Sequence, residues 1–204
     1  LMGLFDRLRG KAHEQFIEVI DWLDDSGEIL VHRFPVANQM IKRGARLTVR
    51  ENQMALFVNE GVAADLFGPG LHNLTTRNIP ILTTLKGWKY GFDSPFKAEV
   101  YFFSTRLMAD QKWGTPQPIM MRDREMGMIR LRAFGTYAFR IKDARLFFST
   151  FVGTRGLTTS EEIVGQLRSI ALSRFSDAVA EAGIPVLDLA ARLDELSEIG
   201  RRQN

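Results

Sequence analysis

The sequence predicts an α+β fold, with an antiparallel β-sheet between an N-terminal amphipathic helix and C-terminal helices. From Met128 to Ile141 every second residue, starting at Ile129, is apolar or glycine, and the residues between them include Arg130, Arg132, Thr136 and Arg140, which is the period of a half-buried antiparallel strand. Apolar residues recur at every third or fourth position in Met2–Trp22 and again in Thr159–Ala182, which is the period of an amphipathic helix. Between these segments lie several short runs with strand character, bounded by turn residues.

The N-terminal helix is expected over Met2–Trp22, with Gly10 weakening it near the middle. Its apolar stripe consists of Phe5, Leu8, Ala12, Phe16, Val19 and Leu23. We expect the second half of this stripe, from Phe16 onward, to pack on the sheet.

Short strands are expected to follow as an antiparallel meander. The predicted strands are Ile29–Phe34, Ala45–Arg50, Gln53–Asn59 and Val62–Phe67. Glu51 and Asn52 are expected to form a tight hairpin turn, and the Gly68-Pro69-Gly70 segment a second turn. After Ile79–Lys86 and a turn at Gly87–Gly91, a further strand is expected at Ala98–Ser104.

The segment Met128–Ile141 is predicted to be one long strand. One face would carry Ile129, Leu131, Ala133, Gly135, Tyr137, Phe139 and Ile141, and the other Met128, Arg130, Arg132, Phe134, Thr136, Ala138 and Arg140. A charged turn ending at Gly127 precedes the strand, and Asp143 is the expected N-cap of a helix that follows it.

Helical signals dominate the last third of the chain. Thr159 and Glu162 have the spacing of a capping box, and Gly183 and Pro185 are expected to end the helix. The apolar arc of this helix is formed by Ile163, Val164, Leu167, Ala171, Phe175, Ala178 and Ala182. A second helix is expected from Leu187 to about Gly200. The predicted organisation is therefore a helical arm at 1–25, an α+β domain at 26–186 and, at 187–204, the start of a longer helical segment.

Composition favours one folded domain without covalent staples. The chain has 204 residues, 45% of them hydrophobic, which is enough to bury a sizeable core. It contains no cysteine, so thiol catalysis, disulfides and thiolate metal sites are excluded for this chain. A net charge of +3 permits anionic lipids or acidic partners. No apolar run approaches the roughly 18 residues of a membrane span, and the first residues lack a signal-peptide core, so we expect a cytoplasmic location.

Catalytic and cofactor motifs are not evident. His13, His32 and His72 fall in three different predicted elements, without the spacing that places two metal ligands on one helix face. The sequence has neither a Gly-x-Ser-x-Gly elbow nor a glycine-rich phosphate loop. We therefore expect no enzymatic activity, no metal and no cofactor.

The long strand also offers a candidate nucleic-acid surface. Arg130, Arg132 and Arg140 share a face with Phe134, and arginines beside an aromatic ring can hold single strands. Nearby carboxylates, including Asp123, Glu125 and Asp143, favour a surface of mixed charge instead. We therefore predict structural pairing or a protein interface, and no nucleic-acid partner.

The order of charged turn, long strand and Asp-capped helix resembles the core of the stomatin, prohibitin and flotillin superfamily, the SPFH or band 7 domain. Two further stretches are similar, namely Gly61–Leu74 with its Pro-Gly turn and Ile184-Pro185-Val186 after the long helix. The segments Leu47–Phe57, Pro80–Trp88, Pro95–Tyr101, Lys112–Thr115 and Pro118–Phe139 resemble a bacterial branch described as virion core protein-like. Full-length members of that branch often carry a C-terminal zinc ribbon, from which this cysteine-free chain departs.

The resemblance implies a membrane-associated scaffold that forms homo-oligomers and recruits other membrane-associated proteins. The predicted lipid contacts are Leu4, Phe5, Arg7, Leu8, Arg9 and Lys11, which combine an apolar stripe with cations that suit an anionic bilayer interface. Assembly is expected through the solvated sides of the helices at Thr159–Ala182 and Leu187–Gly200. The expected location is the inner face of the cell membrane, in peripheral contact with it. The alternative function is a soluble regulatory partner of a protease.

Overall fold

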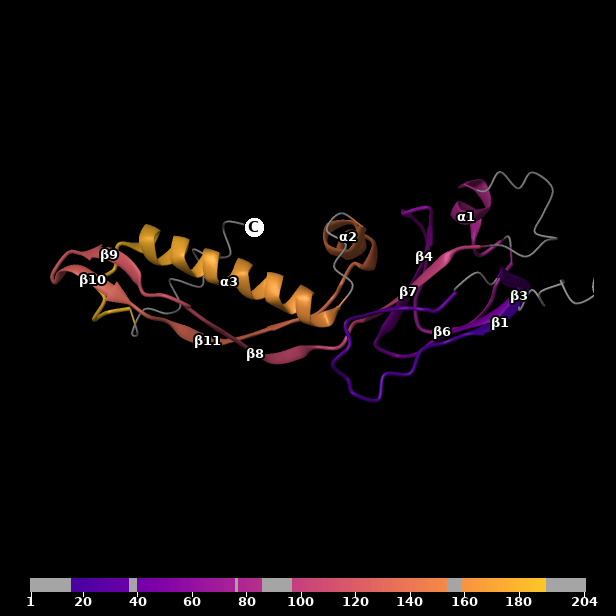
Figure 1. The fold of residues 1–204 in the computed structure, drawn as a ribbon, viewed down its shortest axis with the longest axis horizontal. Helices are drawn as coiled ribbons and strands as arrows, with labels where there is room; N and C mark the ends of the chain where they lie inside the picture. The colour runs from indigo at the N-terminus through magenta and orange to yellow at the C-terminus, as the bar shows by residue number, and fades with distance from the viewer. Residues whose placement is uncertain (1–15, 37–39, 76, 86–96, 154–158, 190–204) are drawn as a thin grey trace, which may run out of the picture. The chain divides into compact units, whose positions relative to one another are not determined.

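The structure is a computed structural model, and it describes residues 16–36, 40–75, 77–85, 97–153 and 159–189. The chain divides into two compact units (Figure 1). Residues 1–106 and 140–160 belong to the first unit, and residues 107–139 and 161–204 belong to the second. The chain therefore passes from one unit to the other three times.

The first unit contains two β-sheets. A three-stranded sheet has the order β1 (Phe16–Ile20), β3 (Met40–Val49) and β6 (Gly70–Asn73). A four-stranded sheet has the order β2 (Val31–Arg33), β7 (Glu99–Ser104), β4 (Gln53–Asn59) and β5 (Val62–Phe67). All paired strands are antiparallel except β1 and β3, which run parallel. The unit also contains α1 (Pro80–Leu85), α2 (Ala144–Phe147) and the π-helical turn η1 (Phe148–Gly153).

The main core of the first unit is built from side chains of both sheets. Its fully buried members include Ile20, Leu47, Phe57, Val100 and Phe102. The opposite side of the four-stranded sheet contacts the two short helical segments, where Phe103 lies 6.1 Å from Phe147 and Tyr101 lies 5.1 Å from Phe148, measured between ring centroids. Strand β4 is buried along almost its whole length because both of its faces are covered.

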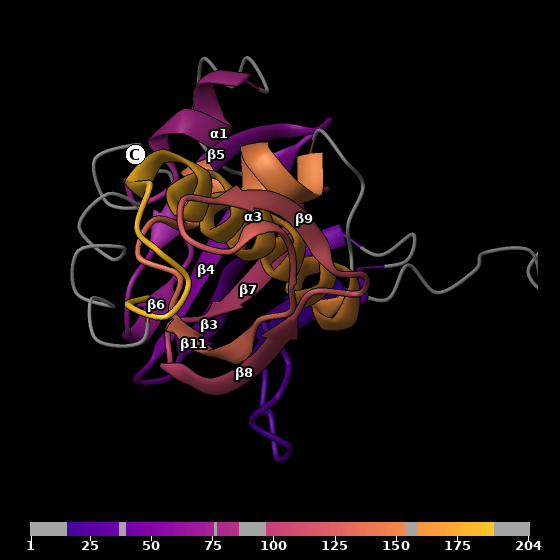
Figure 2. The same ribbon diagram turned by 90° about the vertical axis from the view of Figure 1, so that its left-hand side faces the viewer.

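The second unit is a long β-hairpin covered on one face by a helix (Figures 1 and 2). The hairpin consists of β8 (Met108–Gly114), β9 (Ile119–Asp123), β10 (Gly127–Leu131) and β11 (Phe134–Phe139), with β8 paired to β11 and β9 paired to β10. The helix is α3 (Ser160–Ala182). Trp113 of β8 lies 4.9 Å from Phe175 of α3 between ring centroids, and the Tyr137 hydroxyl donates a hydrogen bond to the Val164 carbonyl at 3.4 Å. These contacts attach the helix to the inner face of the hairpin.

The predicted single strand over Met128–Ile141 is interrupted, and its two parts pair with different partners. Leu131 pairs with Ile119 and Phe134 pairs with Gly114. Between these pairs, the two residues 132–133 lie opposite the four residues 115–118. At this bulge the Thr115 amide donates to the Ala133 carbonyl at 2.9 Å, and the Ala133 amide donates to the Thr115 hydroxyl at 3.2 Å. A side chain thus replaces one backbone partner, and the prediction of an unbroken strand was wrong. The predicted alternation of exposure nevertheless holds through residue 141.

The predicted helix over Met2–Trp22 is wrong in its second half, where Phe16–Ile20 forms strand β1. The residues expected to pack inward, Phe16, Val19 and Leu23, are 42%, 46% and 61% exposed, whereas Ile17 and Ile20 are buried. The register between β1 and β3 shifts between Ile17 and Val19, so residues three positions apart both reach the core. That irregularity produces a helix-like spacing in a strand of β-branched residues. The first half of the predicted helix lies outside the described residues.

The predicted meander is confirmed in the antiparallel pairing of β4 with β5 and wrong in the pairing of its other strands. Gln53–Asn59 and Val62–Phe67 form β4 and β5 with the predicted bounds. Glu51 and Asn52 do form a tight turn, in which Asn52 has a φ of 63°. However, the strands before and after this turn belong to different sheets, so the turn connects two layers and does not close a hairpin.

Two predicted helix signals are confirmed. The Asp143 carboxylate accepts hydrogen bonds from the amides of Arg145 and Leu146 at 2.9 and 3.0 Å, which makes it the N-cap of α2. Gly183 follows the last residue of α3 with a φ of 57°, a left-handed conformation that favours glycine.

Candidate functional site

The six predicted lipid contacts lie outside the described residues. These are Leu4, Phe5, Arg7, Leu8, Arg9 and Lys11, all of which precede β1. Of the two predicted assembly helices, α3 is described, whereas residues 190–204 of the second are not. Lipid contact through the arm and self-assembly therefore remain predictions.

The two described histidines are packed in structural positions. His32 stacks on Trp22 with ring centroids 5.4 Å apart and planes inclined by 7°, and burial lowers its pKa below the ordinary value of 6.5. One ring nitrogen of His72 is hydrogen-bonded to the Gly68 carbonyl at 2.9 Å. His13 lies outside the described residues. Within the described ranges, no group of three or more His, Asp or Glu side chains is arranged to hold a metal ion.

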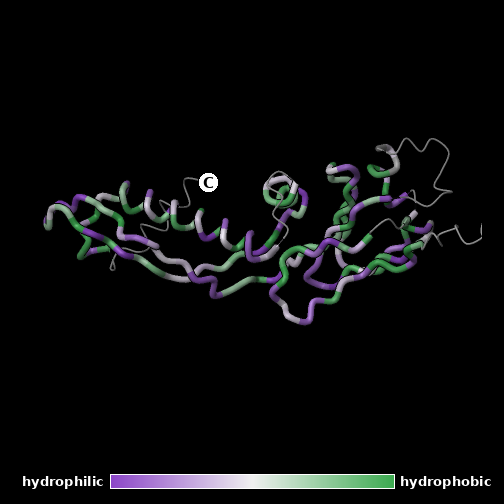
Figure 3. Tube along the Cα trace, viewed as in Figure 1, coloured by the Kyte–Doolittle hydropathy of each residue, from purple (hydrophilic) through white to green (hydrophobic). Residues whose placement is uncertain are grey.

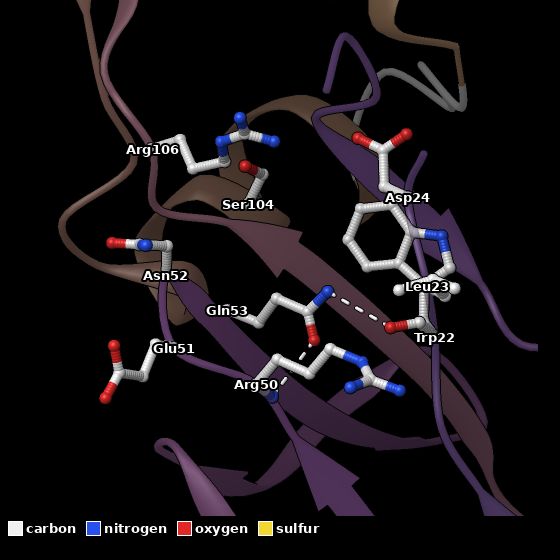
Figure 4. Close-up of a pocket in the computed structure, with 9 residues that line it drawn as sticks. All are labelled: Trp22, Leu23, Asp24, Arg50, Glu51, Asn52, Gln53, Ser104 and Arg106. Atoms are coloured by element: carbon white, nitrogen blue, oxygen red, sulfur yellow. Dashed lines mark hydrogen bonds between the residues drawn. The ribbon is translucent and has the colours of Figure 1, made fainter. Parts of the chain in front are cut away.

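A polar cavity of about 260 Å³ lies in the first unit (Figure 4). It is lined by Trp22, Leu23, Asp24, Arg50, Glu51, Asn52, Gln53, Ser104 and Arg106. The buried Gln53 side chain lies at its centre, donating to the Trp22 carbonyl at 3.2 Å and accepting from the Arg50 amide at 3.1 Å. These bonds satisfy both ends of the amide and connect the loop after β1 to the turn before β4.

Asp24, which lines this cavity, has local hydrogen-bond partners. The Asp24 carboxylate accepts from the Ser26 hydroxyl at 2.7 Å and from the Ser26 amide at 3.1 Å. Burial raises the pKa of Asp24, but these bonds and those from the Gly27 and Ile29 amides outweigh it, so the pKa lies below 3.8. Ser104 shares its cavity with no imidazole among the lining residues, and a serine nucleophile needs an adjacent base. The geometry suits structural hydrogen bonding rather than acyl transfer.

A second polar group joins strands β2 and β7. Arg33 forms an ion pair with Glu99 at 2.6 Å, and the Tyr101 hydroxyl donates to the other oxygen of the same carboxylate at 2.9 Å. Burial, together with Glu99, raises the pKa of Tyr101 to about 12. Tyr101 therefore stays protonated and acts as a hydrogen-bond donor.

The hairpin of the second unit has one face that no described element covers. Along β10 and β11, inward residues alternate with exposed ones, and Figure 3 shows hydrophilic and hydrophobic residues following one another along these strands. We define the outer face as six exposed residues toward the β9–β10 end of the hairpin, namely Met120, Arg122, Met128, Arg130, Arg132 and Phe134. Met128 pairs with Arg122 and Arg130 pairs with Met120, so each cross-strand pair combines a thioether with a guanidinium group. Phe134 is 88% exposed.

Two of the three carboxylates that the sequence suggested as partners for these arginines are used elsewhere. Asp123 is buried on the inner side, where it accepts from the amides of Glu125 and Met126 at 2.9 Å and of Val186 at 2.7 Å. Asp143 caps α2. Among the described residues, no ion pair joins Arg122, Arg130 or Arg132 to a carboxylate. The face is therefore more basic than the sequence suggested.

Sequence reasoning missed that β9 contributes to this face. Met120 and Arg122 alternate with inward residues in the same way as Met128 and Arg130 do. Gly127, with a φ of 78°, ends the turn between the two strands. The alternation over 119–123, followed by a charged turn, was the signal that could have identified the second strand.

Comparison with protein families gives one match that covers most of the chain. The model of the SPFH domain-Band 7 family matches residues 31–203, which include the described strands from β2 to β11 and helix α3. In the described part of the chain, no helix has both the length and the apolar character needed to cross a membrane.

A curated relative is the uncharacterized protein YdjI of Bacillus subtilis (strain 168). It is 29% identical over 186 residues, which are 90% of this chain and 57% of the relative. The chain thus spans a little over half the length of this relative. No solved structure matches the chain.

Proposed function

Because this chain belongs to the SPFH domain-Band 7 family, we propose that it is a non-enzymatic scaffold that attaches to a membrane, self-assembles there and recruits partner proteins. The match over residues 31–203 is the observation that supports this proposal. Proteins of this family are typically membrane-associated scaffolds and are generally not enzymes. The proposed location is the cytoplasmic face of the cell membrane.

The proposed attachment uses the N-terminal arm. Leu4, Phe5 and Leu8 would enter the bilayer interface, each contributing about 1.5 to 3 kcal/mol on burial. Arg7, Arg9 and Lys11 would each add about 1 kcal/mol at an anionic surface. The cost of ordering the arm reduces this total, so one arm gives reversible binding. Several arms in one homo-oligomer would bind much more strongly through avidity.

The proposed assembly surface includes the exposed side of α3. Exposed residues there include Glu161, Arg168, Ser173, Asp177 and Ala180. Both signs of charge are present, which suits pairing with another copy of the same surface. The helix expected over Leu187–Gly200 would extend this contact.

Vesicle flotation tests the attachment. The chain is floated with vesicles of phosphatidylglycerol and phosphatidylcholine and with vesicles of phosphatidylcholine alone, beside the Phe5→Asp/Leu8→Asp variant. A matched control, Leu71→Asp/Leu107→Asp, introduces the same two charges at leucines that are 66% and 64% exposed. We expect anionic-lipid flotation of the chain and the control, with a large loss in the arm variant.

Other outcomes would change the proposal. An arm variant that floats like the parent chain would show that attachment does not use the arm. A parent chain that floats with neither lipid, yet is a homo-oligomer by light scattering, would overturn membrane attachment and favour a soluble regulatory partner of a protease. Unfolding of the arm variant, read by circular dichroism, would place the arm in the core.

A further inference from the structure

The outer face of the hairpin has an unusual composition for a solvent-exposed sheet surface. Its six residues are three arginines, two methionines and one phenylalanine, as defined above. Single exposed apolar side chains are common on protein surfaces, but clusters of them mark interaction sites. Met120, Met128 and Phe134 are 56%, 62% and 88% exposed.

The charge of this face restricts the partner. No carboxylate lies among the six residues, and the nearby Asp123 points inward, where it binds three backbone amides. In the turn beside the face, Arg124 adds a further cation. Glu125, in the same turn, is the single exposed carboxylate within residues 119–134. The complementary surface must therefore be anionic, and guanidinium groups are well suited to phosphate.

The apolar residues decide between anionic partners. Single-stranded nucleic acid is held by successive aromatic rings, whereas Phe134 is the one aromatic side chain among the six. A second copy applied to the same face would oppose arginine with arginine. A lipid surface accepts thioether and phenyl groups beneath its phosphates while guanidinium groups remain level with them. Two cross-strand pairs of β9 and β10 provide this combination, namely Met128 with Arg122 and Arg130 with Met120.

We propose that the outer face of the hairpin is a docking surface for the anionic lipid headgroups of a bilayer. This inference rests on the proposed membrane function, but it assigns lipid contact to the second unit, independently of the N-terminal arm. The inner face of the hairpin remains packed on α3, so docking requires no unfolding.

The experiment removes the arm contribution first. In the full chain carrying Phe5→Asp/Leu8→Asp, binding to phosphatidylglycerol-containing vesicles is measured with and without Arg122→Ser/Arg130→Ser, and separately with Phe134→Ser. The control is Arg46→Ser/Arg77→Ser, which removes two exposed cations from the first unit. We expect residual binding in the arm variant, weakened about 30-fold by the loss of the two hairpin arginines. The control should change binding by less than about threefold.

The outcomes separate this inference from the proposed function. If the parent chain binds vesicles and the arm variant does not, the hairpin proposal fails and arm attachment stands. If the hairpin and control variants weaken binding equally, net charge alone acts and the docking surface is overturned. If the hairpin variant instead loses binding of fluorescent oligothymidylate, or loses self-association by light scattering, while vesicle binding is unchanged, the face serves nucleic acid or a second copy. Phe134→Ser removes an exposed ring without disturbing the core, so reduced vesicle binding in that variant supports lipid contact even if the arginine variant unfolds.

Discussion

The Asp123 carboxylate accepts a hydrogen bond from the backbone amide of Val186 at 2.7 Å, across 63 positions of sequence. Its other oxygen accepts from the amides of Glu125 and Met126 at 2.9 Å. One side chain therefore organises the turn of the hairpin and fixes to it the segment that follows α3. In the second unit, Val179, Ile184 and Leu189 form a small buried cluster close to this connection.

Asp123→Ala should destabilise the second unit, because three backbone amides would lose their acceptor. Hydrogen bonds from the Met126, Val186 and Glu125 amides lower the pKa of Asp123 below 3.8. The stabilisation is therefore present above pH 3.8 and is lost as the pH falls through the lowered pKa. Thermal unfolding of parent and variant should differ at neutral pH and converge in acid. Glu125→Ala, which removes an exposed carboxylate from the same turn, should have little effect; an equal effect would refute this role.

Asp65 caps a helix that is distant from it in sequence. Its buried carboxylate accepts from the amides of Ile81 and Leu82 at 3.1 and 2.8 Å, in the first turn of α1. Asp65→Ala should cost about 1.5 to 3 kcal/mol of unfolding free energy, because these bonds involve a charged acceptor. Urea unfolding measures the cost, and hydrogen exchange should show faster exchange over 80–85. An exposed control, Asp25→Ala, should leave both unchanged, and normal protection of α1 in the Asp65 variant would contradict the prediction.

Two glycines with open space around them should respond in opposite ways to alanine. A Cβ at Gly165 or at Gly61 would meet nothing within 4 Å, but Gly61 has a φ of 81° whereas Gly165 lies within α3. Gly165→Ala should stabilise the helix by about 0.5 to 1 kcal/mol, since alanine loses less entropy there. Gly61→Ala should destabilise the β4–β5 turn, because alanine disfavours positive φ. If the melting temperatures of the two variants shift in the same direction, the open space around each glycine, and not its φ angle, determines the effect of alanine on stability.

His32 should make the first unit sensitive to mild acid. Burial lowers the pKa of His32 below 6.5, so as the pH falls below about 6.5 this histidine is protonated more readily in the unfolded chain than in the folded chain. Unfolding free energy should therefore fall as the pH drops from about 7.5 to about 5.5. His32→Phe can keep the ring contact with Trp22 and cannot titrate, so its pH dependence over this range should be smaller. Urea midpoints at each pH provide the measurement, and an unchanged slope in the variant would assign the effect to other groups.

Local sequence signals identified the elements that depend on nearby residues. The strands at Gln53–Asn59 and Val62–Phe67 have apolar runs bounded by Asn52 and Gly61, both of which adopt positive φ. The pairing of the strands was harder to predict from the sequence. Strand β4 pairs with β7, which is distant in sequence, and no local pattern specifies that partner. The strand at Phe16–Ile20 was mistaken for a helix because Phe16 and Val19 have a helix-like spacing of three. The register shift between Ile17 and Val19 leaves both of these residues exposed and buries Ile17 and Ile20 instead.

The candidate surfaces were predicted in part. Alternation over Met128–Ile141 identified the exposed side chains correctly, since it follows from the strand period alone. The hydrogen bonds of Asp123 could not be predicted from the sequence. Its neighbouring arginines suggested ion pairs, whereas the fold supplies three backbone amides as donors instead. Its partner amide at Val186 lies beyond the helix that packs on the hairpin. The arm at Leu4–Lys11 lies outside the described residues, so its role rests on composition and on the vesicle experiments.

The three passages of the chain between the two units have a consequence for synthesis on the ribosome. The first unit lacks α2 and η1 until residues 140–160 have emerged, and the Leu30 amide reaches its acceptor, the Ser160 hydroxyl, only then. The hairpin is complete by residue 139, but its inner face has no cover until α3 follows. At typical elongation rates of about 5 to 20 residues per second, Trp113 and Tyr137 spend seconds without their helix partners. The nascent chain thus exposes the inner face of the hairpin, with Trp113 and Tyr137, for an interval set by translation speed.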